Sequence, residues 1–366
     1  MKIQLRSLRF VGVGAWARLC QRLVSLRTER GVVRGRGSWP LVPRVKQLGV
    51  LLALLPLATA AAGQPKDLPR IGWVLSGTLA TSRHIVEAMR IGLADEGLAD
   101  GNDVVLDVRY AEGRSERYPA LFADLMRDRA DVLAASSHVG ISSARDASGG
   151  RIPVSAFFCG NDVKQMVDTF SRPGGNITGI SCFSAELAVK RVELLKDAVP
   201  TLRRIGFLYD PRSPGKEKEL AEVRDAAGRL GMTVAAATSS AAENFREAIA
   251  SLRRDGVEAV LISEDNFAFA HRALITALTA EFRMVDIAAF REFVTAGGVL
   301  SYGASVAESI RQQARYAAKL VRGAKPSDLP ILQPTRFEFV VNLKAAQALG
   351  VTIPKEVLLR ADDVIR

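Results

Sequence analysis

The chain has 366 residues, 48% of them hydrophobic, which suits one large or two medium domains with a sizeable core. Its net charge is +11, but the first 46 residues alone hold nine arginines, two lysines and one acidic residue. The rest of the chain is close to neutral, so the overall charge does not indicate a nucleic-acid partner. Such a partner would require basic residues gathered on one face of the folded part.

The start of the chain contains a segment that is typical of exported proteins. Basic residues precede an apolar run at 48–58, and three alanines at 60–62 form a small-residue cleavage site. We therefore predict a signal peptide over 42–62 and a periplasmic mature protein, with no cysteine at the cut for a lipid anchor. The apolar run is shorter than the about 18 residues of a membrane-spanning helix, and a short membrane anchor is the alternative. Residues 1–41 are interpreted as a non-native extension, with the true start near Val42 or Val45.

From residue 68 onward, predicted strands and helices alternate. Buried strands are expected at 70–77, 103–113, 130–137, 152–160 and 176–181, with amphipathic helices at 81–98 and 115–129. The pattern then restarts, with strands at 204–211, 233–240, 259–266, 284–290 and 297–305, and a long helix at 306–322. Strands separated by helices require right-handed crossovers and a parallel sheet covered on both faces. The sequence thus predicts an α/β protein with two doubly wound lobes.

Polar and aromatic residues follow many of these strands. Ligands of open α/β sheets bind beyond the carboxyl ends of the strands, so these residues are candidates for a binding site. They are Ser76, Gly77, Thr78, Tyr110, Ser136, Ser137, His138, Cys159, Gly160, Asn161, Asp162, Tyr209, Asp210, Glu264, Asp265, Asn266, Phe290, Ser301, Tyr302 and Gly303. Such a set can hydrogen-bond and stack on a small polar molecule. The alternative is that the polar members serve as helix caps and turn residues.

The sequence lacks the common catalytic and cofactor motifs. It contains no dinucleotide-binding glycine pattern, no phosphate-binding G-x-x-x-x-G-K-[ST] loop and no G-x-S-x-G elbow. Its three histidines do not have the spacing of metal ligands. We therefore expect no enzyme activity, no cofactor and no metal. Whether Cys159 and Cys182 form a disulfide stays open.

Five strings carry a resemblance to a known family: SRPGGNITGIS at 171–181, KRVELLKDAVPTLRRIGFLYDP at 190–211, REFVTAGGVLSYGAS at 291–305, AAKLVRGAKPSDLPILQPTRFEFVVNLKAAQALGVTIP at 317–354 and LLRADDVI at 358–365. In this order they resemble the ABC-transporter substrate-binding family that includes tryptophan- and tyrosine-binding proteins. The resemblance implies a type I periplasmic-binding fold with a three-crossover hinge. Lobe 1 would comprise 68–181 plus 304–331, and lobe 2 would comprise 182–301 plus 333–366.

The same resemblance implies a function and a set of site residues. The protein would bind a small solute, an amino acid and more narrowly an aromatic one, between the lobes and deliver it to a membrane permease. A monomer is expected. The implied ligand-lining residues are Ser76, Thr78, Ser137, Asp162, Phe183, Asn266 and Tyr302. The sequence departs from the commoner family pattern at 157–170, beside the cleft, which leaves the solute undefined.

Four other functions deserve comparison with the same sequence features. A sensory binding protein that reports to a membrane receptor has the same sequence features and is the main alternative. An α/β enzyme using the cleft is disfavoured because no nucleophile, base pair or metal cluster is positioned. A sugar-responsive repressor would need a helix-turn-helix ahead of residue 68, where an apolar run stands instead. A purely structural role would not explain two lobes with polar strand ends.

Overall fold

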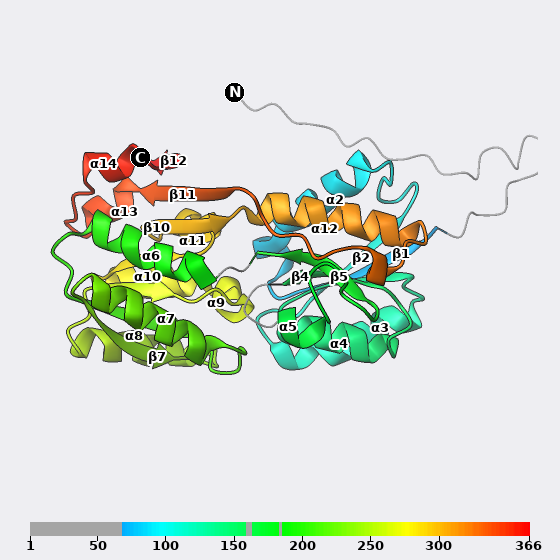
Figure 1. The fold of residues 1–366 in the computed structure, drawn as a ribbon, viewed down its shortest axis with the longest axis horizontal. Helices are drawn as coiled ribbons and strands as arrows, with labels where there is room; N and C mark the ends of the chain where they lie inside the picture. The colour runs from blue at the N-terminus through cyan, green and yellow to red at the C-terminus, as the bar shows by residue number, and fades with distance from the viewer. Residues whose placement is uncertain (1–67, 159–162, 183–184) are drawn as a thin grey trace, which may run out of the picture. The chain divides into compact units, whose positions relative to one another are not determined.

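The computed structural model describes residues 68–158, 163–182 and 185–366 (Figure 1). The expected extension, the signal peptide and the candidate site residues Asp162 and Phe183 lie outside the described residues, as does Cys159. Within the described part, no helix is both long and apolar enough to cross a membrane.

The first lobe is built on a five-stranded parallel sheet with the order β2-β1-β3-β4-β5. Its strands are β1 (Arg70–Leu75), β2 (Val105–Tyr110), β3 (Val132–Ser136), β4 (Val154–Phe158) and β5 (Ile177–Ser181). The connecting helices are α2 (Leu79–Asp95), α3 (Tyr118–Arg127), α4 (His138–Ser148) and α5 (Val163–Met166), with a 3-10 turn η1 (Ser115–Arg117). Four of the five strands are buried along almost their whole length, which accounts for their continuous apolar runs.

The second lobe is built on a seven-stranded sheet with the order β12-β11-β10-β9-β8-β6-β7, in which only the β10–β11 pair is antiparallel. Its strands are β6 (Arg204–Tyr209), β7 (Thr233–Thr238), β8 (Ala259–Ile262), β9 (Val285–Ala288), β10 (Leu300–Ala304), β11 (Phe337–Asn342) and β12 (Asp363–Ile365). Its helices are α6 (Ala185–Ala198), α7 (Lys216–Arg229), α8 (Phe245–Arg254), α9 (Asn266–Ala270), α10 (Arg272–Glu281), α11 (Arg291–Thr295), α13 (Leu343–Ala348) and α14 (Lys355–Leu358), with a 3-10 turn η2 (Ala242–Asn244). Two parallel-sheet lobes of this kind give the expected fold class.

The long helix α12 (Val306–Val321) belongs to the first lobe although strands of the second lobe stand on both sides of it in the sequence. It packs against α2, β3, β4 and β5 (Figure 1). Its Gln313 is fully buried and donates Nε2 hydrogen bonds to the carbonyl oxygens of Ser155 and Ala135. Gly92 of α2 allows the close approach, because a Cβ there would lie 2.7 Å from the Cβ of Ala314.

The chain passes between the lobes three times. It leaves the first lobe after β5, returns after β10, and leaves again between the 3-10 turn η3 (Pro326–Asp328) and β11. The third passage pairs with the first, since the amide of Ser181 donates to the carbonyl of Leu332 over 2.8 Å. These passages form a hinge from which the facing strand ends of both sheets extend.

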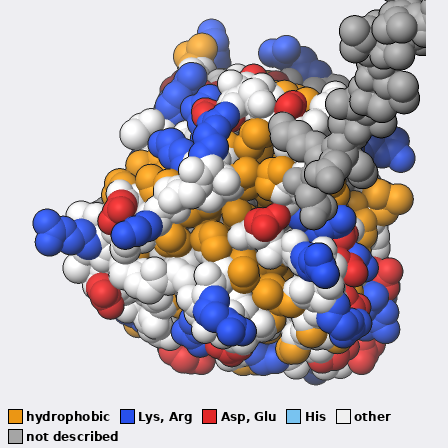
Figure 2. Space-filling model, turned by 90° about the vertical axis from the view of Figure 1, so that its right-hand side faces the viewer, with side chains coloured by type: hydrophobic (Ala, Val, Ile, Leu, Met, Phe, Trp, Pro, Cys, Tyr) orange, Lys and Arg blue, Asp and Glu red, His pale blue; other side chains and the backbone are white. Residues whose placement is uncertain are grey.

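The surface of the first-lobe end mixes charges of both signs. Figure 2 shows hydrophobic side chains in the middle of this face, with lysines, arginines and acidic residues interspersed around them. Basic residues do not form a single stripe in this view, and many of the arginines have acidic neighbours within ion-pair distance.

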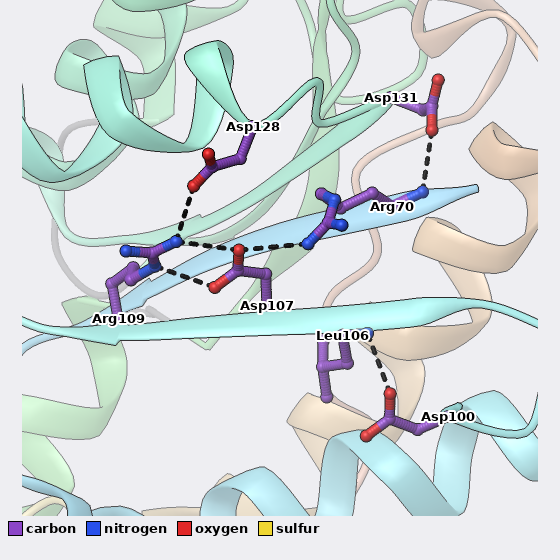
Figure 3. Close-up of polar contacts among 7 residues, drawn as sticks. All are labelled: Arg70, Asp100, Leu106, Asp107, Arg109, Asp128 and Asp131. Carbon is purple, nitrogen blue, oxygen red and sulfur yellow. Dashed lines mark hydrogen bonds and ion pairs between the residues drawn. The ribbon is translucent and has the colours of Figure 1, made fainter. Parts of the chain in front are cut away.

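The edge strand β2 carries a network of charges (Figure 3). The carboxylate of Asp107 accepts hydrogen bonds from Arg109, from Nε over 2.8 Å and from Nη2 over 3.0 Å. It also accepts one from Arg70 Nη1 over 3.3 Å. Asp128 accepts a further hydrogen bond from Arg109 Nη2 over 2.8 Å. The amide of Arg70 donates to Asp131 over 2.7 Å. Charged side chains on an exposed sheet edge hinder pairing with another chain, so the network protects the edge as well as stabilising it.

We expect Asp107→Asn to destabilise the protein by about 1 kcal/mol at neutral pH, because a charge-assisted contact becomes a neutral one. The hydrogen bond from Arg109 is the main cause that holds the pKa of Asp107 below its usual range. A carboxyl with a lowered folded-state pKa stabilises the fold above its unfolded-state pKa, and this contribution is lost as the pH falls through the folded-state pKa. The difference in urea midpoint between wild type and variant should therefore shrink below about pH 4. A difference that stays constant down to pH 3 would contradict this assignment.

Candidate functional site

A cavity lies where the strand ends of the two lobes face each other. Its lining surrounds about 590 Å³ of space that includes open solvent, so it is a cleft open at one side rather than a closed chamber. Residues of both lobes line this first cavity: Ser76, Ala111, Gly113, Arg114, Ser115, Tyr118, Ser137, His138, Val139, Asp210, Arg212, Ser213, Pro214, Asn266 and Phe267. Because both lobes contribute, a bound molecule would bridge them.

The first-lobe wall presents hydroxyls and the start of a helix. Ser137 caps α4, and its Oγ accepts from the amide of Gly140 over 3.2 Å. It does so with φ at 66°, a conformation that is uncommon for a non-glycine residue. The Tyr118 side chain lies beside the Ser137 and Ser76 hydroxyls, and burial raises its pKa to about 12, so it stays neutral. Hydroxyls together with the N-terminus of an 11-residue helix favour an anionic group.

The second-lobe wall holds an acid, a base and an aromatic ring in fixed positions. The buried carboxylate of Asp210 accepts two parallel hydrogen bonds from Arg212, from Nε over 2.9 Å and from Nη2 over 2.8 Å. The Arg212 guanidinium lies 5.0 Å from the centre of the Phe267 ring. Phe267 in turn stacks on Phe245, with 5.2 Å between ring centres, and tilts against His271. The Asp210 carboxylate is thus held at the cavity wall opposite the start of α4.

Asn266 is the first residue of α9, and this position fixes its side chain at the cavity. The preceding Asp265 caps the helix, since its Oδ1 accepts from the amide of Ala268 over 2.6 Å. Burial raises the pKa of Asp265 to about 6, although the nearby Lys216 ammonium opposes the shift. In the described part of the chain, no acceptor lies within hydrogen-bond distance of Asn266 Nδ2, which is buried. A bound molecule can supply that acceptor.

A second, apolar cavity adjoins the first. Its lining surrounds about 350 Å³ of space, open solvent included, and consists of Leu75, Ser76, Ile85, Ser136, Phe157, Asn266, Phe269, Phe290, Val306 and Ile310. Phe269 meets Phe290 edge-on, with 5.6 Å between ring centres. Ser76 and Asn266 line both cavities, so a polar compartment and an aromatic one share a boundary.

Buried charges behind the site hold the Asn266 segment in place. Arg191, only 1% exposed, donates Nη2 to Glu264 Oε2 over 2.7 Å and Nε to the carbonyl of Tyr302 over 2.8 Å. The Glu264 carboxylate also contacts the Cys182 thiol over 2.9 Å, and its backbone carbonyl accepts from Lys216 Nζ over 2.8 Å. The network links the loop before α9 to two of the three hinge passages.

The seven residues implied by the family resemblance are found in different surroundings. Ser76, Ser137 and Asn266 line the first cavity. Thr78 is not among the lining residues of either cavity and instead forms a capping box with Thr81 at the start of α2. Tyr302 is half-buried on β10 beside the rings of Phe337 and Phe339, and it does not line these two cavities either. Asp162 and Phe183 are not described.

Sequence reasoning did not single out Tyr118, Arg212 or the Phe267–Phe269 aromatic wall. Arg212 stands two residues after the strand-end candidate Asp210, and the short string NFAFA at 266–270 follows the candidate Asp265. Alternating aromatic residues directly after a strand end were therefore a usable signal. Tyr118 starts a helix after a 3-10 turn, far from a strand end in sequence, and had no such signal.

Comparisons with known proteins bear on the family and the fold of the chain. Residues 80–365 match the family described as ABC transporter substrate binding protein. The fold is similar to the ABC domain in complex with L-Trp from Streptococcus pneumonia (TM-score 0.74, 23% identity, covering 82% of this chain and all of that one). It is also similar to a conserved domain protein from Vibrio cholerae (TM-score 0.75, 21% identity, covering 81% and 100%). The ligand-free, open substrate-binding protein CD0873 from Clostridium difficile matches with a TM-score of 0.59 at 20% identity, covering 81% and 99%. A search of curated protein sequences returned no match.

Proposed function

Because this chain belongs to the family of ABC transporter substrate-binding proteins, we propose that it binds an amino acid with an apolar, preferably aromatic, side chain between its lobes. The family consists of binding proteins rather than enzymes, so the solute leaves the site chemically unchanged. The observation that carries the proposal is the shared boundary of the polar and the aromatic cavity at Ser76 and Asn266. One molecule with a charged head and an apolar tail can occupy both.

The polar cavity offers partners for both charges of an amino acid. The helix start at Ser137 and the Arg114 side chain suit a carboxylate. The Asp210 carboxylate, buried on the opposite wall, suits an ammonium group. Asn266 Nδ2 can donate to a carboxylate oxygen. A zwitterion thus fits this cavity better than a neutral sugar does.

The apolar cavity then receives the side chain. Its walls come from Phe157, Phe269 and Phe290 together with aliphatic residues, which favours stacking and edge-on contacts with another ring. The Streptococcus protein of similar fold was solved with L-Trp, a ligand of this chemical class.

Because residues of both lobes form the cavity, binding of the solute stabilises the closed arrangement of the lobes. A ligand that raises the closed fraction from about one half to about 99% needs about 2.7 kcal/mol of preference for the closed form. A few charge-assisted hydrogen bonds and one buried ring supply energies of this order. The closed, solute-loaded monomer would then dock on a membrane permease.

We propose that the protein binds its solute in the periplasm, after export directed by the signal peptide at 42–62. N-terminal sequencing of the protein from its native host tests the placement. A mature N-terminus directly after Ala62 is expected. One upstream of Arg44 would contradict both the cleavage site and the proposed start of translation.

A thermal-shift screen of the purified protein against the twenty amino acids and a panel of monosaccharides tests the solute class. A ligand at 100 times its dissociation constant stabilises the folded form by about 2.7 kcal/mol. For a domain pair of this size, that amounts to a rise in melting temperature of about 5 °C. The largest shifts are expected with L-Trp, L-Tyr and L-Phe. Shifts with a sugar and none with any amino acid would refute the proposal.

A further inference from the structure

Beyond the hinge and the cavities, the two lobes touch at a separate place, between α2 of the first lobe and α10 and α11 of the second. Arg272, the first residue of α10, donates from Nη2 to the carbonyl oxygen of Thr81 in the first turn of α2 over 3.0 Å. Close by, Nε2 of His84 lies 3.5 Å from Oε1 of Glu292 on α11. Each contact joins one residue of the first lobe to one of the second.

The Arg272 side chain is held in position by its own lobe. Its Nη1 donates to the carbonyl of Phe269 over 2.9 Å, and its guanidinium lies 4.7 Å from the centre of the Phe269 ring. Burial lowers the pKa of Arg272, and the Glu292 carboxylate opposes the shift, but an arginine remains protonated in proteins. These two contacts within its own lobe restrain the guanidinium, so little side-chain entropy is lost when the bond to Thr81 forms.

A third contact beside Arg272 shows how closely the lobes approach here. Gly113 of the first lobe lies against the His271 ring, and a Cβ on Gly113 would come within 2.6 Å of Cε1 of that ring. The backbone of Gly113 has φ at 77°, which glycine adopts without strain. Glycine at this position thus permits a contact that a side chain would block.

None of Thr81, His84, Arg272 and Glu292 lines either cavity, whereas Phe269 lines the apolar one. We propose that Arg272 is a positioning residue for solute binding, an interlobe latch that stabilises the closed arrangement without touching the solute. The inference rests on the proposed function only in taking the solute to lie between the lobes. The latch sets the closing equilibrium, and therefore the affinity for every solute alike.

Small-angle X-ray scattering of the ligand-free protein tests the latch without a solute. In Arg272→Gln the shorter amide cannot reach the carbonyls of both Thr81 and Phe269, so the radius of gyration should exceed that of wild type. The matched control is Arg246→Gln, because Arg246 is an exposed arginine of the same lobe whose partner, Glu281, lies in that lobe too. This control should scatter as wild type does. Equal radii for Arg272→Gln and wild type overturn the proposal.

Calorimetry with L-Trp, L-Tyr and L-Phe gives the second readout. For each of these amino acids that wild type binds, Arg272→Gln should weaken binding by about tenfold. The factor should be the same for each amino acid, because the charged hydrogen bond that is lost lies away from the solute. Unequal factors would place Arg272 in direct contact with the solute and overturn the latch. If wild type binds none of the three, the proposed function fails while the scattering comparison still decides the latch. If Arg272→Gln does not fold, Arg272→Lys replaces it in both measurements. This variant keeps the charge but loses the planar guanidinium that donates to two carbonyl oxygens.

Discussion

Glu264→Ala is expected to lower the free energy of unfolding by about 3–5 kcal/mol, because it leaves the buried Arg191 guanidinium without its charged partner. The two side chains are 1% and 2% exposed and 2.7 Å apart, so water cannot replace the lost carboxylate. The variant also removes the acceptor of the Cys182 contact. Urea unfolding at neutral pH, followed by circular dichroism, measures the loss.

A matched control separates burial from charge pairing. Glu281→Ala breaks the pair with Arg246, whose side chains are about half exposed, and should cost less than about 1 kcal/mol. The double variant Glu264→Leu with Arg191→Met should recover much of the loss, since a buried ion pair replaced by apolar residues of similar size is often neutral. A cost for Glu264→Ala no larger than that for Glu281→Ala would show that Arg191 finds another partner.

Asn266→Ala is expected to weaken amino-acid binding by about 10- to 100-fold, the range expected for losing a hydrogen bond to a charged group. Asn266 lines both cavities, and its Nδ2 donor has no acceptor within the described residues. Its side chain does not cap α9, which Asp265 does, so the helix should persist in the variant. Calorimetry with the amino acid that gives the largest thermal shift measures the effect, and an unchanged melting temperature of the free protein checks the fold.

Tyr302→Ala provides the comparison for that experiment. The family resemblance implies that Tyr302 lines the cleft, whereas its ring lies beside Phe337 and Phe339 on the hinge strand. If the two cavities hold the solute, Tyr302→Ala should weaken binding less than Asn266→Ala does. A larger loss in Tyr302→Ala would place the solute closer to the hinge and remove Asn266 from the centre of the site.

The sequence was most informative about buried parallel strands. A strand covered on both faces needs a continuous apolar run, and β1, β3, β4 and β6 stand where such runs predict them. Three residues at a sheet edge carry almost no periodic signal, so the short strand β12 is not predictable from the sequence. The segment 266–282 forms two helices, α9 and α10, with a break at His271, whose ring packs on Phe267. Such a break depends on contacts between side chains rather than on helix propensity.

The sequence indicates which residues follow the strand ends, but not which of them face the cavity. Ser76, Ser137 and Asn266 follow strands whose carboxyl ends meet, and the topology alone brings them together. Thr78 follows the same strand as Ser76 but starts a helix, where the local capping box with Thr81 turns its hydroxyl to the backbone. No sequence pattern separates a polar residue that caps a helix from one that faces a ligand, because both roles use the same hydroxyl and the same position.

The placement of α12 has a consequence for how the newly made chain acquires its structure. The helix that covers α2 and the central strands of the first lobe is encoded at 306–321, after five of the seven strands of the second lobe. A ribosome has therefore synthesised more than four-fifths of the protein before the N-terminal lobe can bury Ser155 against Gln313. Until then the N-terminal lobe lacks the helix that buries part of its core, so its packing is completed by a segment from near the other end of the chain.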